Sequence, residues 1–376
     1  MKTNKTIRIA QVIGKLNAAG VESVINNYYK FIDHSKYQFD YFIDSDGQYP
    51  PKQELIDIGA KYYIIPPYQN LIKHVIVLTK LFKENKYQIV HSNMNTLAPI
   101  SLFCAWLAGV PIRINHNHST SSRGEYFRNV IKYLLRPFAK CFATNYVACS
   151  KVAAKWLFGS NAVNNGSVMI FNNAIDITIF KYNENSRILI RKEFGLNDKF
   201  VIGHVGRFEY VKNHNFIIEL FKRIHDNNKN SILLLVGTGS LLSKIKKKVS
   251  LLGLEKCVFF LGVRDDVFKI YSAMDVFILP SYSEGLGMVG IEAQAVGLPC
   301  IFSNQIPSEA KILKSTIYLP IDKIEEWEAV IHKFMNFKKE DVHSIMCQSR
   351  FNIVTESRKL EDFYDKLISS CKNQTN

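Results

Sequence analysis

The chain has 376 residues, more than one ordinary domain core holds, and this length predicts two domains. Its formal net charge is +15 at pH 7, and residues 1–178 contribute 20 Lys and Arg against 10 Asp and Glu. A basic half of this kind predicts an anionic partner, such as a nucleic acid, a membrane surface or a phosphorylated substrate. No run of about 18 apolar residues occurs, which argues against a transmembrane helix.

The seven cysteines favour a reducing compartment. Their number is odd, most lie inside apolar runs, and none forms a CxxC pair or stands at metal-ligand spacing from a histidine. We therefore expect reduced core cysteines in a cytoplasmic protein. The N-terminus lacks the pattern of a signal peptide, because the apolar run Ile7–Ile13 is interrupted by Arg8 and Gln11.

Strands and helices are predicted to alternate along the first half of the chain. Strands are expected at Ile7–Ile13, Tyr37–Ile43, Tyr62–Ile65, Gln88–His91, Ile112–Asn115, Ala143–Cys149 and Val168–Phe171. Helices are expected at Val21–Phe31, Leu71–Lys83, Thr96–Leu107, Tyr126–Arg136 and Lys151–Phe158, and 14–20 is expected as a loop. This alternation predicts a parallel sheet in a doubly wound α/β domain.

The polar segment Asn172–Ser186 is predicted to be the linker, after which the alternation resumes. Strands are expected at Phe200–Val205, Ile232–Val236 and Val258–Leu261, and helices at Asn213–Asp226, Leu241–Leu252 and Asp265–Ala273. The last segment, Ser344–Cys371, is helical in pattern. We therefore predict an N-terminal domain of residues 1–178, a C-terminal domain of residues 179–354, and a helix at about 355–376 that crosses back, with both sheets opening on a shared cleft.

The stretch from Asp275 to Phe302 carries the strongest local signal. It predicts a buried strand, a loop with Glu284, Gly285 and Gly287, and a helix that begins near Met288 and stops before Gly297 and Pro299. Glycines before a helix N-terminus leave N–H groups open to an anion. Two carboxylates beside such a phosphate seat, Glu284 and Glu292, suit hydrogen bonds from sugar hydroxyls. The alternative is that Glu284 caps the helix and Glu292 lies on a solvated face.

Two cations are predicted at the same end of the second sheet. Arg207 directly follows the strand Phe200–Val205, and Lys212 directly precedes a helix. A guanidinium and an ammonium can neutralise a diphosphate leaving group as its charge develops, without a metal. The alternative is that both are ordinary exposed cations.

These motifs resemble a known enzyme family. GRFEYVKNH at Gly206–His214, VGTGSL at Val236–Leu241 and SEGLGMVGIEAQAVGLP at Ser283–Pro299 are similar to the retaining glycosyltransferases of family four, which have the two-domain GT-B fold. AGVE at Ala19–Glu22 resembles that family's N-terminal glycine loop, and FNNAID at Phe171–Asp176 its interdomain segment. The resemblance covers most of the chain and is closest to enzymes of bacterial capsular and exopolysaccharide assembly. Ala19 and Ala174 stand where the family commonly has glycine.

The resemblance implies roles for particular residues. Arg207 and Lys212 would hold the donor diphosphate, Glu292 would accept from the ribose hydroxyls, and Glu284 would hold hydroxyls of the donor sugar. Further donor-binding positions implied by the family motifs are Gly20, Gly237, Gly239, Gly285, Leu286 and Gly287. His116 matches a family histidine near the reaction centre, and His118 is the second choice. Either histidine could instead be a structural residue that bonds only to backbone.

The resemblance also implies the chemistry. No enzymic nucleophile is evident, so retention suggests attack on the same face of the sugar, with the leaving phosphate oxygen helping to deprotonate the acceptor hydroxyl. No cofactor and no metal are expected. Asp44 and Asp46 form an Asp-x-Asp after a strand, which could hold a divalent metal, but a turn with Gly47 explains it as well.

Two other functions are alternatives to a glycosyltransferase. An NAD-dependent oxidoreductase or nucleotide-sugar epimerase would need GxGxxG after the first strand, and no glycine lies between Gly14 and Gly20. A nucleic-acid-binding protein is prompted only by a pI near 9.3, and no recognition motif supports it. We therefore expect a glycosyltransferase at the cytoplasmic face of the membrane, which moves a sugar from a nucleotide donor, most simply UDP-linked, to a lipid-linked saccharide.

A basic segment in the first half predicts how the protein would reach such an acceptor. Basic residues recur every four positions, at Arg128, Lys132, Arg136 and Lys140, and Pro137 should end or kink the helix near Arg136. Apolar residues cluster on another side, at Phe127, Ile131, Leu134, Leu135 and Phe138. This pattern predicts an amphipathic helix that docks on an anionic membrane; the alternative is a surface helix whose apolar face lies in the domain core.

Overall fold

The computed structural model describes residues 6–16, 20–47, 50–119 and 126–375, and of these the side chains of 126–128 and 374–375 are left aside. The described chain divides into two compact units. The first contains the described residues up to Ile175 together with those from Arg350 on, and the second contains Asp176–Ser349. Both boundaries fall a few residues before the expected ones, after 178 and 354.

The first unit is built on a parallel sheet of seven strands in the order β3-β2-β1-β4-β5-β6-β7. The strands are β1 Ile7–Gly14, β2 Tyr37–Asp44, β3 Lys61–Ile65, β4 Ile89–Ser92, β5 Ile112–Asn117, β6 Asn145–Ala148 and β7 Val168–Ile170. The helices are α1 Gly20–Phe31, α2 Gln53–Asp57, α3 Leu71–Asn85, α4 Ala98–Leu107, α5 Tyr126–Leu135, α6 Lys151–Phe158, α7 Ser160–Asn164 and α15 Ile353–Thr375, with short 3-10 turns η1 Asn95–Leu97 and η2 Arg136–Phe138. The predicted doubly wound parallel sheet is confirmed for this unit.

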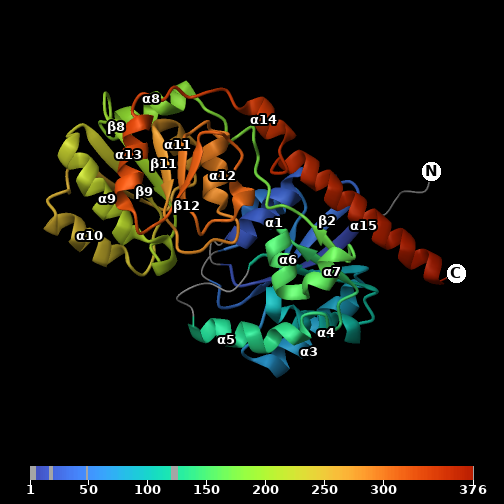
Figure 1. Cartoon of the computed structure of the whole chain (residues 1–376). Helices are drawn as coiled ribbons and strands as arrows, with labels where there is room; N and C mark the ends of the chain where they lie inside the picture. The colour runs from blue at the N-terminus through green and yellow to red at the C-terminus, as the bar shows by residue number, and fades with distance from the viewer. Residues whose placement is uncertain (1–5, 17–19, 48–49, 120–125, 376) are drawn as a thin grey trace. The chain divides into compact units, whose positions relative to one another are not determined.

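The last helix of the chain belongs to the first unit. Figure 1 shows α15 beside α1, and its side chains Leu360, Phe363, Tyr364 and Ile368 are buried in the core that also holds Tyr28 of α1. Spacings of three and four residues place these four side chains on one face of the helix. Burial of that apolar face explains why the chain returns from the second unit to the first.

The return point is fixed by backbone pairing. Ile175 pairs with Asn352 in a parallel bridge, with its N–H donating to the Phe351 carbonyl at 2.9 Å. The Asn352 side-chain oxygen accepts from the Val354 N–H at 3.0 Å, as a helix N-cap does. The segment predicted as one helical stretch is therefore two helices, α14 His343–Gln348 and α15.

The second unit has a parallel sheet of six strands in the order β10-β9-β8-β11-β12-β13. The strands are β8 Phe200–Val205, β9 Ser231–Val236, β10 Val258–Gly262, β11 Val276–Leu279, β12 Cys300–Ser303 and β13 Thr316–Leu319. The helices are α8 Glu184–Glu193, α9 His214–Asn227, α10 Leu242–Leu251, α11 Val267–Ala273, α12 Met288–Ala295, α13 Ile324–Phe334 and α14, with 3-10 turns η3 Tyr210–Lys212 and η4 Ser308–Ala310. The second doubly wound unit is confirmed as well.

The predicted linker is partly wrong. Asn172 is tied into the first unit, because its N–H donates to Glu356 Oε2 at 2.8 Å, and α8 already begins at Glu184. The polar run contains the N-cap of α8, because the Asn183 side chain accepts from the Ser186 N–H at 2.8 Å. This helix is also held by charge: Arg187 and Arg191 both pair with Asp275, at 2.7 and 2.6 Å.

The prediction for the cysteines holds in part. Cys104, Cys149, Cys257 and Cys300 are buried and unpaired, as expected of core thiols. Cys141 and Cys347 are exposed and are not core residues, whereas Cys371 is half-buried and packs against the core of the first unit. The short apolar runs that contain these three cysteines lie on turns and helices rather than on buried strands.

Candidate functional site

The sheet of the second unit reverses its winding between β8 and β11, which pair directly. The strand order runs outward to β9 and β10 on one side and to β12 and β13 on the other. In such sheets ligands bind outside the carboxyl ends of the strands at this reversal. The loop after β8 carries Arg207 and leads to Lys212, and the loop after β11 carries Glu284, so the predicted donor residues come together here.

Lys212 and Glu284 form an ion pair. The Lys212 Nζ donates to Glu284 Oε1 at 2.6 Å, and the side chains are only 16% and 13% exposed. The hydroxyl of Ser281 also donates to Glu284 Oε1, at 2.6 Å. The predicted cation and the predicted sugar-binding carboxylate thus neutralise each other in this structure, a pairing that the sequence pattern did not reveal.

Arg207 stands apart from this pair. It is exposed, and within the part of the chain that the structure describes its side chain makes no ion pair. Beneath the loops lie two buried histidines, His204 and His214, whose pKa values are lowered, first by burial. The pKa of His214 falls to about 3, so this support is uncharged at neutral pH.

Helix α12 begins at Met288, as predicted from the glycines before it. Gly287 has φ +78°, a left-handed conformation that suits glycine, and directly precedes the helix. Gly285 is exposed, whereas Leu286 is buried at 4% exposure. The turn therefore presents backbone at Gly285 and anchors itself through Leu286.

Glu292 lies on α12 and accepts a hydrogen bond from the Tyr271 hydroxyl at 2.9 Å. Burial raises the pKa of Glu292 to about 7, and the Tyr271 hydrogen bond and the Lys212 charge act in the opposite direction. Lys212 is thus close enough to act on both carboxylates. A partly desolvated carboxylate that is half protonated near neutral pH is suited to exchange its proton for hydrogen bonds from a ligand.

The pH dependence of UDP binding should reveal this carboxylate. If Glu292 accepts from ribose hydroxyls, as the family resemblance implies, its ionised form binds them best, while burial raises its pKa to about 7 in the free protein. We expect UDP affinity to level off above that pH and to fall below it, by about tenfold per pH unit from this group alone. Calorimetry of wild type and Glu292→Gln from pH 5 to 9 separates this effect from the ligand's own titration, which both proteins share. Parallel profiles would remove Glu292 from the ribose site.

Gly237 and Gly239 pack the loop after β9 against the loop after β8. A Cβ at Gly237 would lie 2.2 Å from the Gly206 carbonyl oxygen, and one at Gly239 would lie 2.6 Å from that of Phe208. Gly237 also has φ +131°. Both positions therefore require glycine for backbone contact, which explains the motif whether or not these N–H groups also meet a phosphate.

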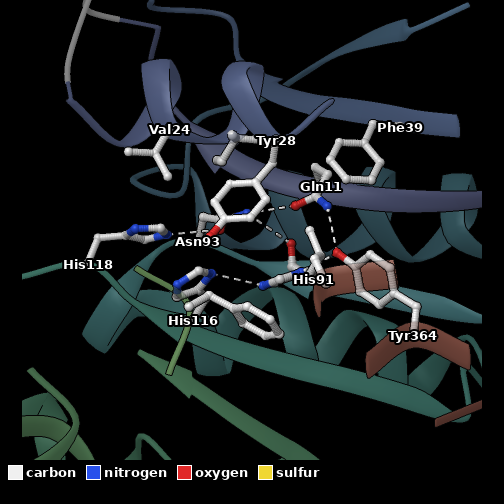
Figure 2. A pocket seen from close by; sticks show the side chains of 12 residues that line it. Gln11, Val24, Tyr28, Phe39, His91, Asn93, His116, His118 and Tyr364 are labelled. Carbon is white, nitrogen blue, oxygen red and sulfur yellow. Dashed lines mark hydrogen bonds between the residues drawn. The ribbon is translucent and has the colours of Figure 1, made fainter. Parts of the chain in front are cut away.

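The first unit has its own reversal, between β1 and β4. Here the carboxyl ends of β4 and β5 carry His91, His116 and His118 into a pocket (Figure 2). The rings of His116 and His118 stack with centroids 3.9 Å apart, and His91 Nε2 lies 3.1 Å from His116 Nδ1. Burial lowers all three pKa values, those of His91 and His118 to about 3, so the cluster is neutral at pH 7.

The two candidates His116 and His118 therefore lie together rather than as alternatives. Nε2 of His116 and Nδ1 of His118 are buried without a hydrogen-bond partner among the described residues, although Asn173 is near enough to His118 to raise its pKa. A buried polar atom without a hydrogen-bond partner is unfavourable unless a ligand or a water molecule bonds to it.

Gly20 is the first residue of α1 and is exposed, and a Cβ there would meet nothing within 4 Å. The neighbouring Ala19 lies outside the described residues.

The two carboxylates of the Asp-x-Asp pair have different surroundings. Asp46 is paired with Lys15, while Asp44 is buried with both carboxylate oxygens lacking a partner. Burial and then the Asp46 charge raise the pKa of Asp44 to about 6. Across the described ranges, no group of three or more His, Cys, Asp and Glu side chains is placed to hold a metal ion.

Comparison with known proteins identifies the family. Residues 186–345 match the model of the family described as glycosyl transferases group 1. A putative glycosyltransferase, EpsF of Bacillus subtilis, is 32% identical over 305 residues, which cover 80% of this chain and 79% of that protein. The chain belongs to this family of glycosyltransferases. It is accordingly an enzyme, a hexosyltransferase, and the oxidoreductase alternative finds no support.

Two further comparisons extend the match to nearly the whole chain. An Escherichia coli protein, UDP-Gal:alpha-D-GlcNAc-diphosphoundecaprenol alpha-1,3-galactosyltransferase, is 28% identical over 391 residues, 97% of this chain and 98% of that protein. The crystal structure of Anabaena HepE in complex with UDP and glucose matches with a TM-score of 0.80 at 18% identity, covering 96% of this chain and all of that one. The predicted GT-B fold, with two Rossmann-like doubly wound domains, is confirmed.

Several residues of both sites were missed from sequence. Tyr271 and Ser281, which hold the two glutamates, belong to a buried helix and a strand end and carry no motif of their own. His91 ends one predicted strand and His116 directly follows the neighbouring one, so the same rule applied to both strand ends would have found His91. Tyr364 lies 273 positions after His91, and only the folded contact of α15 brings the two together.

Proposed function

We propose that this glycosyltransferase transfers a sugar, with retention, from a UDP-linked donor to a lipid-linked saccharide in the assembly of a capsular or exopolysaccharide. The observation that carries the proposal is the cluster at the β8 and β11 ends, where Lys212 pairs with Glu284 and its charge also acts on Glu292, beside the Gly287 turn. The name of the E. coli relative, with a UDP-galactose donor and a diphosphoundecaprenol acceptor, supports both substrates.

The proposed chemistry follows from the charges present. Arg207 is free to approach a diphosphate, and Lys212 can leave Glu284 for it, so that both cations stabilise the leaving group. Glu284, released from Lys212, then accepts from donor sugar hydroxyls, and Glu292 accepts from ribose. The N–H groups of the Gly285–Gly287 turn, with those that open α12, add a partial positive charge. No metal is needed in this scheme.

Identification of the reaction products tests this proposal. We would incubate the protein with a panel of UDP and other nucleotide sugars and with an undecaprenyl-diphosphate-linked saccharide. Mass spectrometry should show an acceptor heavier by one hexose residue or its N-acetyl form, and NMR of the new linkage should show the anomeric configuration of the donor. An inverted linkage would contradict retention, and transfer only to free sugars would contradict the lipid-linked acceptor.

We also propose that α5 and η2 dock the enzyme on an anionic membrane surface on the cytoplasmic side. The helix ends at Leu135, close to Arg136 as Pro137 predicts, and Arg136–Phe138 form a 3-10 turn. Most of its described apolar side chains are exposed: Val130, Ile131, Tyr133, Leu134 and Phe138 are 40 to 67% exposed, and Leu135 is half-buried. Arg128 and Phe127 lie outside the described side chains. Apolar side chains next to lysines and arginines are the signature of an interfacial segment. No helix in the described residues is long and apolar enough to cross a bilayer.

Charge reversal tests this surface. Replacing Arg128, Lys132 and Arg136 by glutamate should release the protein from anionic liposomes, because each cation near such a surface contributes about 1 kcal/mol. Flotation at low and high salt measures it, since salt screens the attraction. A matched control reverses three exposed lysines of the second unit, Lys244, Lys247 and Lys256. Equal flotation of both triple variants would show that net charge, not this segment, governs binding.

A further inference from the structure

Four polar side chains in the first unit form a file of hydrogen bonds that leads away from His118 (Figure 2). His118 Nε2 lies 3.0 Å from Asn93 Oδ1, and Asn93 Nδ2 donates to Gln11 Oε1 at 2.9 Å. Gln11 Nε2 then donates to the hydroxyl of Tyr364 at 3.3 Å. All four side chains are buried, so these hydrogen bonds do not compete with water.

The file continues from Tyr364 to His116. The Tyr364 hydroxyl lies 2.8 Å from His91 Nδ1, and His91 Nε2 lies 3.1 Å from His116 Nδ1. Figure 2 shows the His91 ring between the tyrosine and His116. His116 Nε2 is the end of the file, buried and without a partner among the described residues.

One backbone group sets the direction of the whole file. Asn93 Nδ2 also donates to the backbone carbonyl of His91 at 3.3 Å, and a carbonyl can only accept. The Asn93 amide is therefore oriented with its oxygen towards His118, so His118 carries its proton on Nε2. The Asn93 nitrogen faces Gln11 Oε1, which turns the Gln11 nitrogen towards Tyr364.

The remaining protons follow from that orientation. The Tyr364 oxygen accepts from Gln11, so its own O–H is left to donate to His91 Nδ1. His91 is neutral and must then carry its proton on Nε2, which donates to His116 Nδ1. His116, also neutral, is left with its proton on Nε2, which has no acceptor among the residues that the structure describes.

We propose that Tyr364 and His91 are positioning residues that hold His116 in the neutral Nε2–H tautomer, so that His116 donates a hydrogen bond to a hydroxyl oxygen of the sugar substrate. The identity of that ligand rests on the proposed function; the tautomer does not. The partners that orient a functional histidine commonly fix its tautomer in this way. Tyr364 comes from α15, so the returning C-terminal helix supplies a part of the site in addition to packing on the core.

The tautomer is measured first, in the wild-type protein without substrate. With ¹⁵N-labelled histidine, long-range ¹H–¹⁵N spectra distinguish a protonated from an unprotonated ring nitrogen. We expect His116 to show a proton on Nε2 and a bare Nδ1 throughout pH 6 to 8, and Tyr364→Phe to populate the other tautomer. A wild-type His116 with its proton on Nδ1 would overturn the inference, whatever any variant does.

Activity is measured next, against a matched variant. Tyr364→Phe removes the hydroxyl that orients His91 and should lower kcat/KM by about tenfold or more, as loss of an orienting partner typically does, with UDP affinity unchanged. Tyr37→Phe is the control: its hydroxyl donates to Asp365 of the same helix at 2.6 Å but lies outside the file. His91→Gln retains an N–H for His116 and should keep more activity than His91→Leu.

The outcomes separate the two proposals. If wild type transfers no sugar while His116 shows the Nε2 proton, the proposed function fails and the positioning survives. If wild type is active but Tyr364→Phe and Tyr37→Phe have the same kcat/KM, or His91→Gln is no better than His91→Leu, the positioning role is wrong. Thermal unfolding of each variant shows whether a loss of activity is merely a loss of folded protein.

Discussion

Lys212→Ala should lower kcat about a hundredfold, a loss on the order of 3 kcal/mol in transition-state stabilisation. The reason is the position of the ammonium: it is only 16% exposed, lies 2.6 Å from Glu284 and also acts on the Glu292 carboxylate. Without it, two carboxylates would face the diphosphate with Arg207 as the remaining cation of the predicted set. A chelator should leave wild-type activity intact, since the leaving-group charge would be neutralised by these side chains.

The matched control is Lys222→Ala in the same unit. Lys222 forms an exposed pair with Asp226 on α9, and such a surface pair contributes little to stability or binding. We expect this variant to match wild type in kcat and in UDP affinity. If a chelator abolished wild-type activity and manganese restored it, the metal-free mechanism would be contradicted. It would return attention to Asp44, whose buried oxygens have no partner among the described residues.

Much of the architecture could be predicted because it rests on local patterns. The start of α12 at Met288 was fixed by Gly285 and Gly287, and the end of α5 by Pro137, each a backbone effect confined to a few residues. Strands such as Phe200–Val205 were readable as buried apolar runs. The pattern is wrong at Asn172–Ser186, where a polar run predicts a linker although the segment contains the cap of α8.

The partners of the site residues could not be predicted in the same way. Lys212 and Glu284 are 72 positions apart, and motif reasoning assigned each to the ligand and neither to the other. The file from His118 to His116 depends on Tyr364, which reaches His91 only because an apolar face of α15 packs on α1. Sequence patterns indicate which residues carry chemistry, but hydrogen-bond direction and pKa depend on burial and on contacts between distant segments.

Because Lys212 and Glu284 form a pair, we expect Glu284→Gln to change UDP affinity and the rate of sugar transfer in opposite directions. In Glu284→Gln, Lys212 loses its carboxylate partner and remains partly buried, which leaves its charge poorly compensated. A diphosphate would then no longer have to displace Glu284 from Lys212. UDP should therefore bind more tightly to Glu284→Gln than to wild type, by about tenfold if the pair is worth on the order of 1.4 kcal/mol in this half-desolvated setting.

Transfer should change in the other direction. An amide accepts hydrogen bonds from sugar hydroxyls less well than a carboxylate does, since bonds to a charged acceptor are roughly twice as strong. We expect kcat for Glu284→Gln to fall by about tenfold to a hundredfold while UDP affinity rises. Calorimetry with UDP and initial rates with the full donor measure the two effects. The double variant Lys212→Ala/Glu284→Gln should lose the gain in UDP affinity, because the unpaired ammonium that produces it is gone. If UDP bound Glu284→Gln more weakly than wild type, the carboxylate would be a direct ligand of the nucleotide, and the ion pair would not be the gate to the diphosphate site.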